Sequence, residues 1–379
     1  MYDTSWSICY LPFIAIVVGY LTLVRHLRYR RKESIEARFL TRPLSSMTTK
    51  EAHEIIAQLQ ELEFPYAFAK ARRIALLKAG GIPTMSKLFA ATGQNTRRNA
   101  GKRSVDTEIL LRESQSKFRD SDRYATAVAR MNYLHSRYRR ANKITDPDLL
   151  HTLGDGLAEI LTVVGRDEWR QLTDAEKCAV GVFHKNLGED MRIPLDPLPS
   201  SASGVYVDSA VSTLPDFVRT ALRATLGADL DDVMRTSLNL ETPGFILSSF
   251  LTITRNIRIL YLRHLALPRP SSRPVKLVDE TPNAKTRLYN FGRKGLQPWY
   301  VKPTFWSKWG PLALLVRAMG GKAPGTRGER YQPHGYDLMT IGPEPQKGKG
   351  LEDMITDAEV IKAKGVATCP FSQGKFSIN

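Results

Sequence analysis

The sequence predicts an all-α protein with one membrane-spanning helix at its N-terminus, and three observations support this prediction. Residues 5–24 form a run of 20 residues without a charged side chain. Downstream of it, apolar residues recur at helical spacing between residues that commonly begin and end helices. No series of alternating apolar and polar residues indicates a sheet, and no βαβ rhythm is present.

The uncharged run has the length of a membrane anchor. At 1.5 Å rise per residue, about 20 helical residues cross a hydrocarbon core of roughly 30 Å. Basic residues stay on the cytosolic side, and they follow the run at Arg25, His26, Arg28, Arg30, Arg31 and Lys32. We therefore expect a single-pass protein whose C-terminal domain faces the cytosol. The alternative, a cleaved signal peptide, would place its positive charge before a shorter apolar core.

The composition gives the chain a formal charge of +17, from 55 basic and 38 acidic residues. Such a surplus indicates an anionic neighbour, which is nucleic acid, an acidic membrane surface or an acidic substrate. No nucleic-acid-binding module is recognisable, so no nucleic acid is expected as partner. The basic residues after the anchor suit anionic headgroups, and we expect membrane lipid to contact residues 5–32. Three cysteines are too few and too scattered for a disulfide framework, which favours a reducing compartment.

The predicted helices follow one another with short connections. Prolines suited to first helical turns stand at Pro65, Pro83 and Pro147. Thr173 and Glu176 have the spacing of a capping box. The expected helices span residues 51–63, 65–80, 83–92, 104–117, 120–142, 146–165, 173–188, 213–225 and 241–267.

The distal part of the chain has a different character. Residues 245–254 are apolar, but Arg255 and Arg258 follow at once, so we expect a core helix there and not a second span. Beyond about residue 268, proline, glycine and basic residues predominate. The predicted organisation is a short tail (1–4), the anchor (5–24), a basic juxtamembrane segment (25–48), a helical domain (49–270) and an irregular C-terminal extension packed on that domain, with a loose end (271–379).

One predicted helix presents a histidine among apolar residues. On a helix the stripe is formed by Tyr124, Val128, Met131, His135 and Tyr138, at spacings of 4, 3, 4 and 3. A histidine on such a face ligates a metal, or it is a core residue bonded to a backbone carbonyl. Arg139 lies one turn beyond and suits an anion such as a haem propionate, unless it is a surface residue. Sequence signatures of nucleotide, zinc-protease and serine-hydrolase sites are absent.

Four stretches carry a resemblance to a known family. They are EFPYAFAKARRIALLKAGGIPTMSKLFAATGQ at 63–94, KRSVDTEILLRE at 102–113, RMNYLHSRYRRANKITDPDLL at 130–150 and WRQLTDAEKCAVGVFHKNLGEDMRIP at 169–194. Together they resemble the haem oxygenases that include the bacterial latex-clearing rubber oxygenases and the fungal ER-bound oxygenases. The N-terminal anchor matches the fungal branch.

The resemblance implies a globin-reminiscent helical fold around one haem b. The family's H-x-x-x-R motif, which supplies the axial iron ligand, corresponds to His135 and Arg139. The distal R-x-x-K-T motif of the rubber enzymes corresponds to Arg103, Asp106 and Thr107, with aspartate in place of lysine. The catalytic glutamate of the rubber enzymes has no counterpart between residues 79 and 102, which leaves Asp106 as a candidate proton acceptor.

The function implied by the resemblance is oxidative cleavage of a carbon–carbon double bond by haem and O2, in a hydrophobic, isoprenoid-like substrate. The implied location is the membrane of the endoplasmic reticulum. Two other functions fit the residues alone. One is a non-catalytic, membrane-tethered helical scaffold, and the other is a basic protein that binds anionic lipid or nucleic acid.

Overall fold

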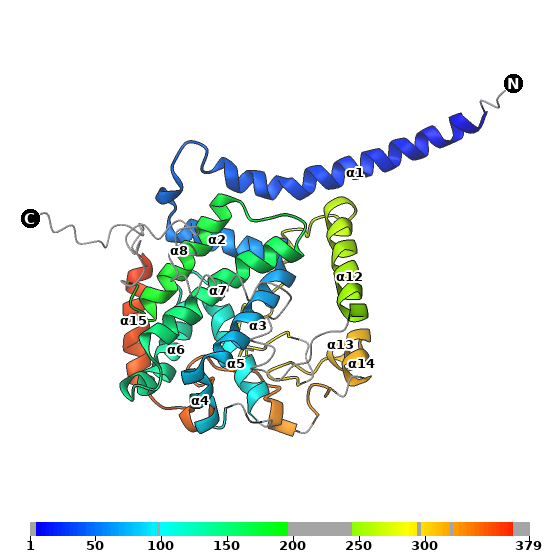
Figure 1. Ribbon diagram of the computed structural model, residues 1–379. Helices are drawn as coiled ribbons and strands as arrows, with labels where there is room; N and C mark the ends of the chain where they lie inside the picture. The colour runs from blue at the N-terminus through cyan, green and yellow to red at the C-terminus, as the bar shows by residue number, and fades with distance from the viewer. Residues whose placement is uncertain are drawn as a thin grey trace, which may run out of the picture.

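The computed structural model describes residues 5–94, 96, 99–195, 245–293, 297–318, 321–326 and 328–366. Its first element is a single long helix, α1 (Ser5–Ala37), which leaves the domain and exposes its apolar half (Figure 1). Among the described helices, α1 is the one that is long and apolar enough to cross a membrane. The predicted helix at 213–225 and the loose end of the chain lie outside the described residues.

The helical domain confirms the predicted order of helices. Its first turns contain the three prolines, and the capping box of Thr173 and Glu176 forms as expected. Further capping boxes form at Thr48 and Thr145. A 3₁₀ turn (Leu44–Ser46) precedes the domain and a π-helical turn (Leu59–Glu63) extends its first helix. The helices are α2 (Thr49–Gln58), α3 (Pro65–Gly81), α4 (Pro83–Ala91), α5 (Ala100–Ser116), α6 (Asp122–Arg140), α7 (Asp146–Asp167) and α8 (Asp174–Asp190).

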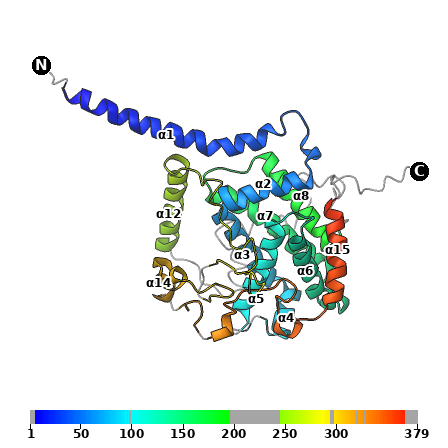
Figure 2. The ribbon, with the colours of Figure 1, turned by 180° about the vertical axis from the view of Figure 1, so that it is seen from behind.

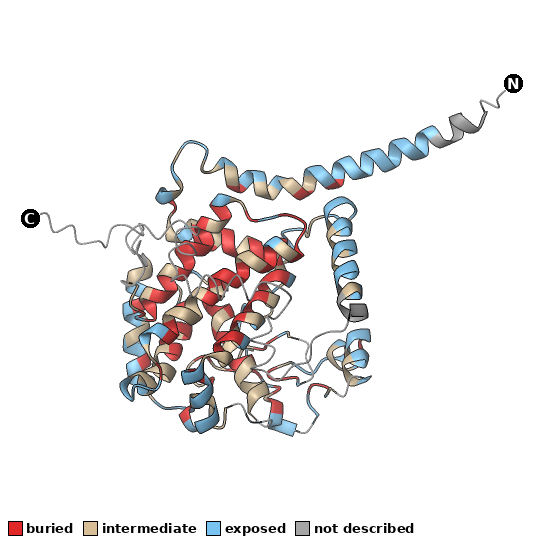
Figure 3. Ribbon diagram, viewed as in Figure 1, coloured by how far each residue is buried: buried red, intermediate tan, exposed pale blue. Residues whose placement is uncertain are grey.

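The core lies where these helices pack in pairs, α3 against α7, α2 against α8 and α5 against α6. Figure 3 shows the buried residues gathered in this part, whereas α1 and α12 (Phe245–His264) are largely exposed. Trp169, Phe64 and Phe68 are among its fully buried residues. No β-strand occurs in the described ranges, where the backbone forms only two isolated bridges, Val278 with Phe291 and Tyr289 with Tyr336. The prediction of an all-α protein is therefore confirmed.

The C-terminal extension wraps around α5 and α6. Residues 271–350 are mostly irregular, with short helices at α13 (Phe305–Trp309), α14 (Pro311–Ala318), Gly328–Tyr331 and Glu344–Gln346. The chain then forms α15 (Leu351–Val366), which packs against α6 (Figure 2). Lys362 at the end of α15 pairs with Asp122 at the start of α6, so the two helices are antiparallel. The expectation of an irregular extension missed this regular helix.

Helix α12 corrects one further expectation. It is not a core helix, because Phe250, Ile253 and Ile257 are each more than half exposed. Leu262 packs against the core, and basic residues form the hydrogen bonds to the domain. Arg258 donates to the carbonyl of Asp167, and Arg263 donates to the carbonyl of Trp169. The amphipathic pattern is present but is turned outward.

Candidate active site

His135 lies in the C-terminal half of α6 and combines two properties of an iron ligand. Its ring is surrounded by protein atoms but keeps part of its surface accessible. Burial, assisted by the positive charge of Arg139, lowers the pKa of His135 to about 4, so the ring is neutral at pH 7. No side chain or carbonyl among the described residues forms a hydrogen bond with either ring nitrogen. A neutral imidazole with a free nitrogen is the form that binds iron.

His184 on α8 provides a contrast within the same core. Burial lowers its pKa to about 4 as well. Its Nδ1 lies 2.8 Å from the carbonyl oxygen of Val180, one turn earlier. Its Nε2 faces α7, where it would be 3.5 Å from a Cβ added at Gly156. His184 is therefore a core histidine bonded to a backbone carbonyl. This was the alternative to metal ligation for a histidine on an apolar helix face.

Arg139 already has several partners. Its guanidinium donates to the carbonyls of Met191 and Arg192, at 3.2 and 3.0 Å, and to the Asp146 carboxylate at 2.6 Å. These contacts join α6 to the end of α8 and the start of α7. The structure therefore shows a bracing role for this residue. A contact between Arg139 and a haem propionate would require an exchange of these partners.

Arg103 on α5 is less well satisfied. Its guanidinium carbon lies 4.0 Å from the centre of the Phe89 ring on α4, and its Nε is buried without an acceptor among the described residues. Burial lowers the pKa of Arg103 from its usual value. The hydroxyl of Thr107 donates to the Arg103 carbonyl at 2.9 Å, within the helix. Arg103 is thus a desolvated cation with a free donor, a costly arrangement unless an anion or a polar group is bound there.

Asp106 is buried one turn further along α5 and both its oxygens are engaged. Oδ1 accepts from the Tyr300 hydroxyl at 2.7 Å, and Oδ2 accepts from Lys102 at 2.8 Å. Burial raises the pKa of Asp106 to about 6, although both partners oppose the shift. The residue does not cap the helix, which begins at Ala100. Tyr300, which belongs to the C-terminal extension, was not predicted from the sequence as a partner of Asp106.

The N-terminal half of α5 and the C-terminal half of α6 meet through the extension. The Gly342 carbonyl accepts from Lys102 at 2.7 Å, and a Cβ added at Gly342 would be 3.2 Å from Leu134, the neighbour of His135. Phe89 joins from α4, which Figure 1 places at the end of the domain away from α1. No hydrogen bond joins His135 directly to Arg103, Asp106 or Thr107. In the described part of the chain, no cluster of three or more His, Cys, Asp or Glu residues is arranged to hold a metal ion.

The structure is that of a helical protein with an apolar N-terminal helix and a half-buried, neutral histidine that has no hydrogen-bond partner among the described residues. Comparison with known proteins identifies its relatives. The chain is 31% identical to the ER-bound oxygenase mpaB' of Penicillium brevicompactum, over 97% of this chain and 95% of the relative. It is 33% identical to the ER-bound oxygenase mpaB of the same organism, over 93% of this chain and 90% of the relative. No family model and no solved structure matches. The chain belongs to the family of ER-bound oxygenases mpaB.

Proposed function

We propose that this protein is a membrane-anchored, haem-dependent oxygenase that cleaves a carbon–carbon double bond in a hydrophobic, isoprenoid-like substrate with O2. The observation that carries the proposal is the neutral, half-buried imidazole of His135, which has no hydrogen-bond partner among the described residues. The names of the relatives support an oxygenase bound to the endoplasmic reticulum. The resemblance to the rubber oxygenases supports haem as the cofactor and an alkene as the reacting group.

The residues present fit a haem b. Haem iron needs one axial ligand from the protein, and His135 supplies a neutral nitrogen for it. The buried Nε of Arg103, which has no acceptor in the described part of the chain, fits a neighbouring anion or polar oxygen. When bound, the haem supplies the redox chemistry with O2.

The protein contributes binding and electrostatics to the reaction. Arg103, which is shielded by Phe89, offers N–H donors that stabilise negative charge on a reacting oxygen. Thr107 turns its hydroxyl hydrogen toward its own helix and leaves its oxygen as an acceptor. Asp106, with a pKa of about 6, exchanges a proton near neutral pH through Tyr300 or Lys102. Arg103, Asp106 and Thr107 are the proposed catalytic group, and His135 is the proposed ligand. Arg139 joins α6 to α7 and α8.

The anchor suits a lipid-soluble substrate. The apolar half of α1 is exposed, and basic residues follow it immediately, which favours a single span with the domain in the cytosol. A substrate that partitions into the bilayer is then concentrated beside the enzyme.

The proposal is tested on the full chain purified in detergent. We expect a Soret band, one haem b per chain after pyridine extraction, and incorporation of label from ¹⁸O2 into carbonyl products of an isoprenoid alkene. A chain that is folded by circular dichroism but binds no added haemin would overturn the proposal. A chain that binds haem but oxidises no alkene would retain the cofactor and exclude the reaction.

A further inference from the structure

The apolar residues of α12 form a stripe on its outward side. Phe250, Ile253, Ile257, Leu260 and Tyr261 follow one another at helical spacing, and each is 55–61% exposed. In a soluble surface helix such a stripe faces the core, and basic residues face water. In α12, by contrast, Arg258 and Arg263 bind the domain beside Leu262, and the larger apolar stripe faces outward. The stripe therefore faces an apolar environment outside the protein.

A second apolar surface lies close by in the C-terminal extension. Helices α13 and α14 contain no buried residue, although most of their side chains are apolar. Phe305 and Trp306 are about 70% exposed, and Trp309 and Leu315 are about half exposed. Figures 1 and 2 show α13 and α14 along the same side of the domain as α12. We refer to the outward side chains of these three helices as the α12–α14 face.

The segment that contains this face is strongly basic. Residues 242–328 include fifteen lysines and arginines, and their only acidic residues are Asp279 and Glu280. Most of the formal charge of +17 therefore resides in this part of the sequence. Arg317 lies over the ring of Trp309, with its guanidinium carbon 4.5 Å from the ring centre. Aromatic rings beside cations are typical of the boundary between acyl chains and anionic headgroups.

The α12–α14 face is continuous with α1. The Tyr20 hydroxyl donates to the Leu265 carbonyl at the end of α12, and Arg28 donates to the carbonyls of Ala266 and Leu267. These bonds fix α1 against the end of α12. The apolar half of α1 projects beyond the side of the domain where α12, α13 and α14 lie (Figure 1).

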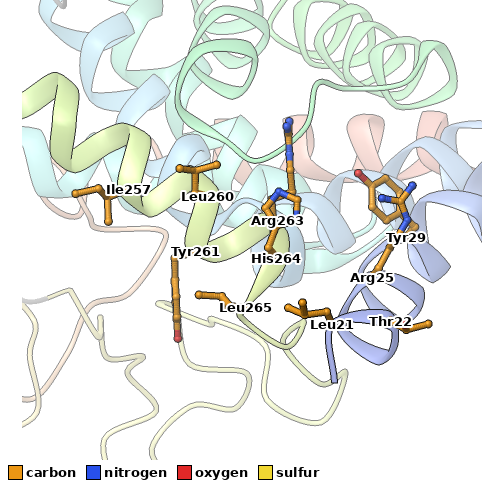
Figure 4. Close-up of a pocket in the computed structure, with 10 residues that line it drawn as sticks. All are labelled: Leu21, Thr22, Arg25, Tyr29, Ile257, Leu260, Tyr261, Arg263, His264 and Leu265. Carbon is orange, nitrogen blue, oxygen red and sulfur yellow. The ribbon is translucent and has the colours of Figure 1, made fainter. Parts of the chain in front are cut away.

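A hollow of about 700 Å³ lies where α1 and α12 diverge. Its walls are mainly apolar, with Leu21 and Tyr29 on α1 and Ile257 and Leu260 on α12 (Figure 4). Arg25 and His264 also line it and add polar groups. An apolar hollow with cations beside it fits a lipid acyl chain and its anionic headgroup.

From these contacts we infer that the α12–α14 face is a docking surface for the phospholipid bilayer that α1 enters, so that α12, α13 and α14 lie in the headgroup region. Its exposed apolar side chains enter the acyl boundary, as in amphipathic helices that lie in the membrane plane. A second copy of the chain would bring the basic segments of two molecules together, whereas anionic lipid neutralises them.

The chain contains its own probes for a test. Of its five tryptophans, Trp306 and Trp309 lie on the face, and Trp169 and Trp299 are buried in the domain. The fifth, Trp6, lies in the uncharged run and is removed by Trp6→Phe. The full-length Trp6→Phe chain is reconstituted in vesicles of phosphatidylcholine and phosphatidylserine, with and without bromine on the phosphatidylcholine acyl chains. Brominated chains quench only tryptophans that reach the bilayer.

We expect brominated vesicles to quench roughly half of the emission of the Trp6→Phe chain, because two of its four tryptophans lie on the face. Adding Trp306→Phe and Trp309→Phe should abolish the quenching, and the buried tryptophans serve as internal controls. Equal emission from the Trp6→Phe chain in both kinds of vesicle would overturn the inference. If quenching is absent and chemical crosslinking of the reconstituted chain gives dimers, the face binds a second copy, and this result would also overturn the inference.

Discussion

At the scale of single residues, His135 and His184 form a matched pair for identifying the ligand. Both are neutral, with pKa values of about 4, but only His184 is bonded to a backbone carbonyl. We predict that His135→Ala abolishes or strongly shifts the Soret band, because the iron loses its axial nitrogen. His184→Ala and the more exposed His151→Ala should retain it. A visible spectrum of each variant decides, and a normal haem content in His135→Ala would eliminate the site.

Substitution of Arg103 should affect turnover and stability in different ways. Its guanidinium is partly desolvated and its Nε has no acceptor among the residues that the structure describes, so removing the charge relieves a cost in the haem-free protein. We predict that Arg103→Met keeps or raises the melting temperature and lowers turnover by about 10²-fold, the usual effect of losing one stabilising donor. The exposed Arg73→Met is the control and should change neither quantity. A lower melting temperature with unchanged turnover would give Arg103 a structural role.

Asp106 makes stability depend on pH in a predictable direction. Its pKa of about 6 in the folded protein exceeds the usual value of 3.8, so the folded chain binds a proton that the unfolded chain has released. Its contribution to stability is full below pH 3.8 and is lost as pH rises through 6. Asp106→Asn removes this titration. Relative to wild type, the variant should gain up to about 3 kcal/mol in unfolding free energy between pH values of about 4 and 7.5. Chemical denaturation in detergent measures this, and an equal difference at both pH values would contradict it.

The residue contacts show what local sequence reveals and what it hides. The pair of Lys102 and Asp106 is separated by four positions on one helix, so its contact could be expected from spacing. The contact between Asp106 and Tyr300 spans 194 positions and depends on the path of the extension. The spacing of His135 on an apolar stripe predicted its burial. The absence of a hydrogen-bond partner for it in the described ranges could not be predicted, because this depends on every element packed around it.

At the scale of elements, α12 shows why periodicity alone was insufficient. The apolar spacing predicted a helix there, and the helix is present. Periodicity gives the angle between apolar and polar sides but does not say which side meets the protein. The side of α12 that carries Arg258 faces the domain, because Arg258 donates to the Asp167 carbonyl and the Glu168 carboxylate. The prediction was therefore correct about the secondary structure of this segment and wrong about its burial.

Helix α6 depends on the C-terminal extension through one fully buried cation. Arg130 donates to the carbonyls of Ile341 and Gln346, at 2.7 and 3.0 Å. We predict that Arg130→Met lowers the unfolding free energy by about 3–5 kcal/mol, because it leaves buried acceptors unpaired. Residues 340–350 should then become sensitive to limited proteolysis. Arg137→Met, at an exposed position of the same helix, is the control. Similar unfolding free energies of the two variants would show that Arg130 does not hold the extension on α6.

At the scale of the whole molecule, local sequence signals predicted the helices of the domain better than the path of the C-terminal extension around it. Caps and first-turn prolines act within a few residues, and they defined the succession from α2 to α8 correctly. The extension has few such signals, and buried contacts with α5 and α6 determine its path. Among these are the bonds from Arg130 to its carbonyls and from Tyr336 to Glu113. Its course could not be derived from spacing, and neither could α15.

The attachment of α1 leads to a prediction about the intact protein. The uncharged run ends at Val24, but Arg28 and Arg31 continue into contact with the domain. Arg28 also lies over Trp169, and Arg31 pairs with the buried Glu63. The first part of the helix is thus the proposed anchor, and its second part is a structural element of the domain. The two parts can be separated by truncation.

We predict that deleting residues 1–24 releases the protein from membranes in a carbonate wash. The melting temperature should fall only modestly, because the deletion removes the buried Val24 and the Tyr20 bond to Leu265 but keeps Arg28 and Arg31. Carbonate also strips binding through the α12–α14 face, because that face does not cross the bilayer. Deleting residues 1–32 should release the protein too, but it should lower the melting temperature further, because Glu63 also loses its Arg31 partner. A carbonate-resistant pellet of the shorter deletion would contradict a single anchor. In sealed microsomes, protease should digest the C-terminal domain of the intact chain, and its protection would reverse the orientation that the basic flank predicts.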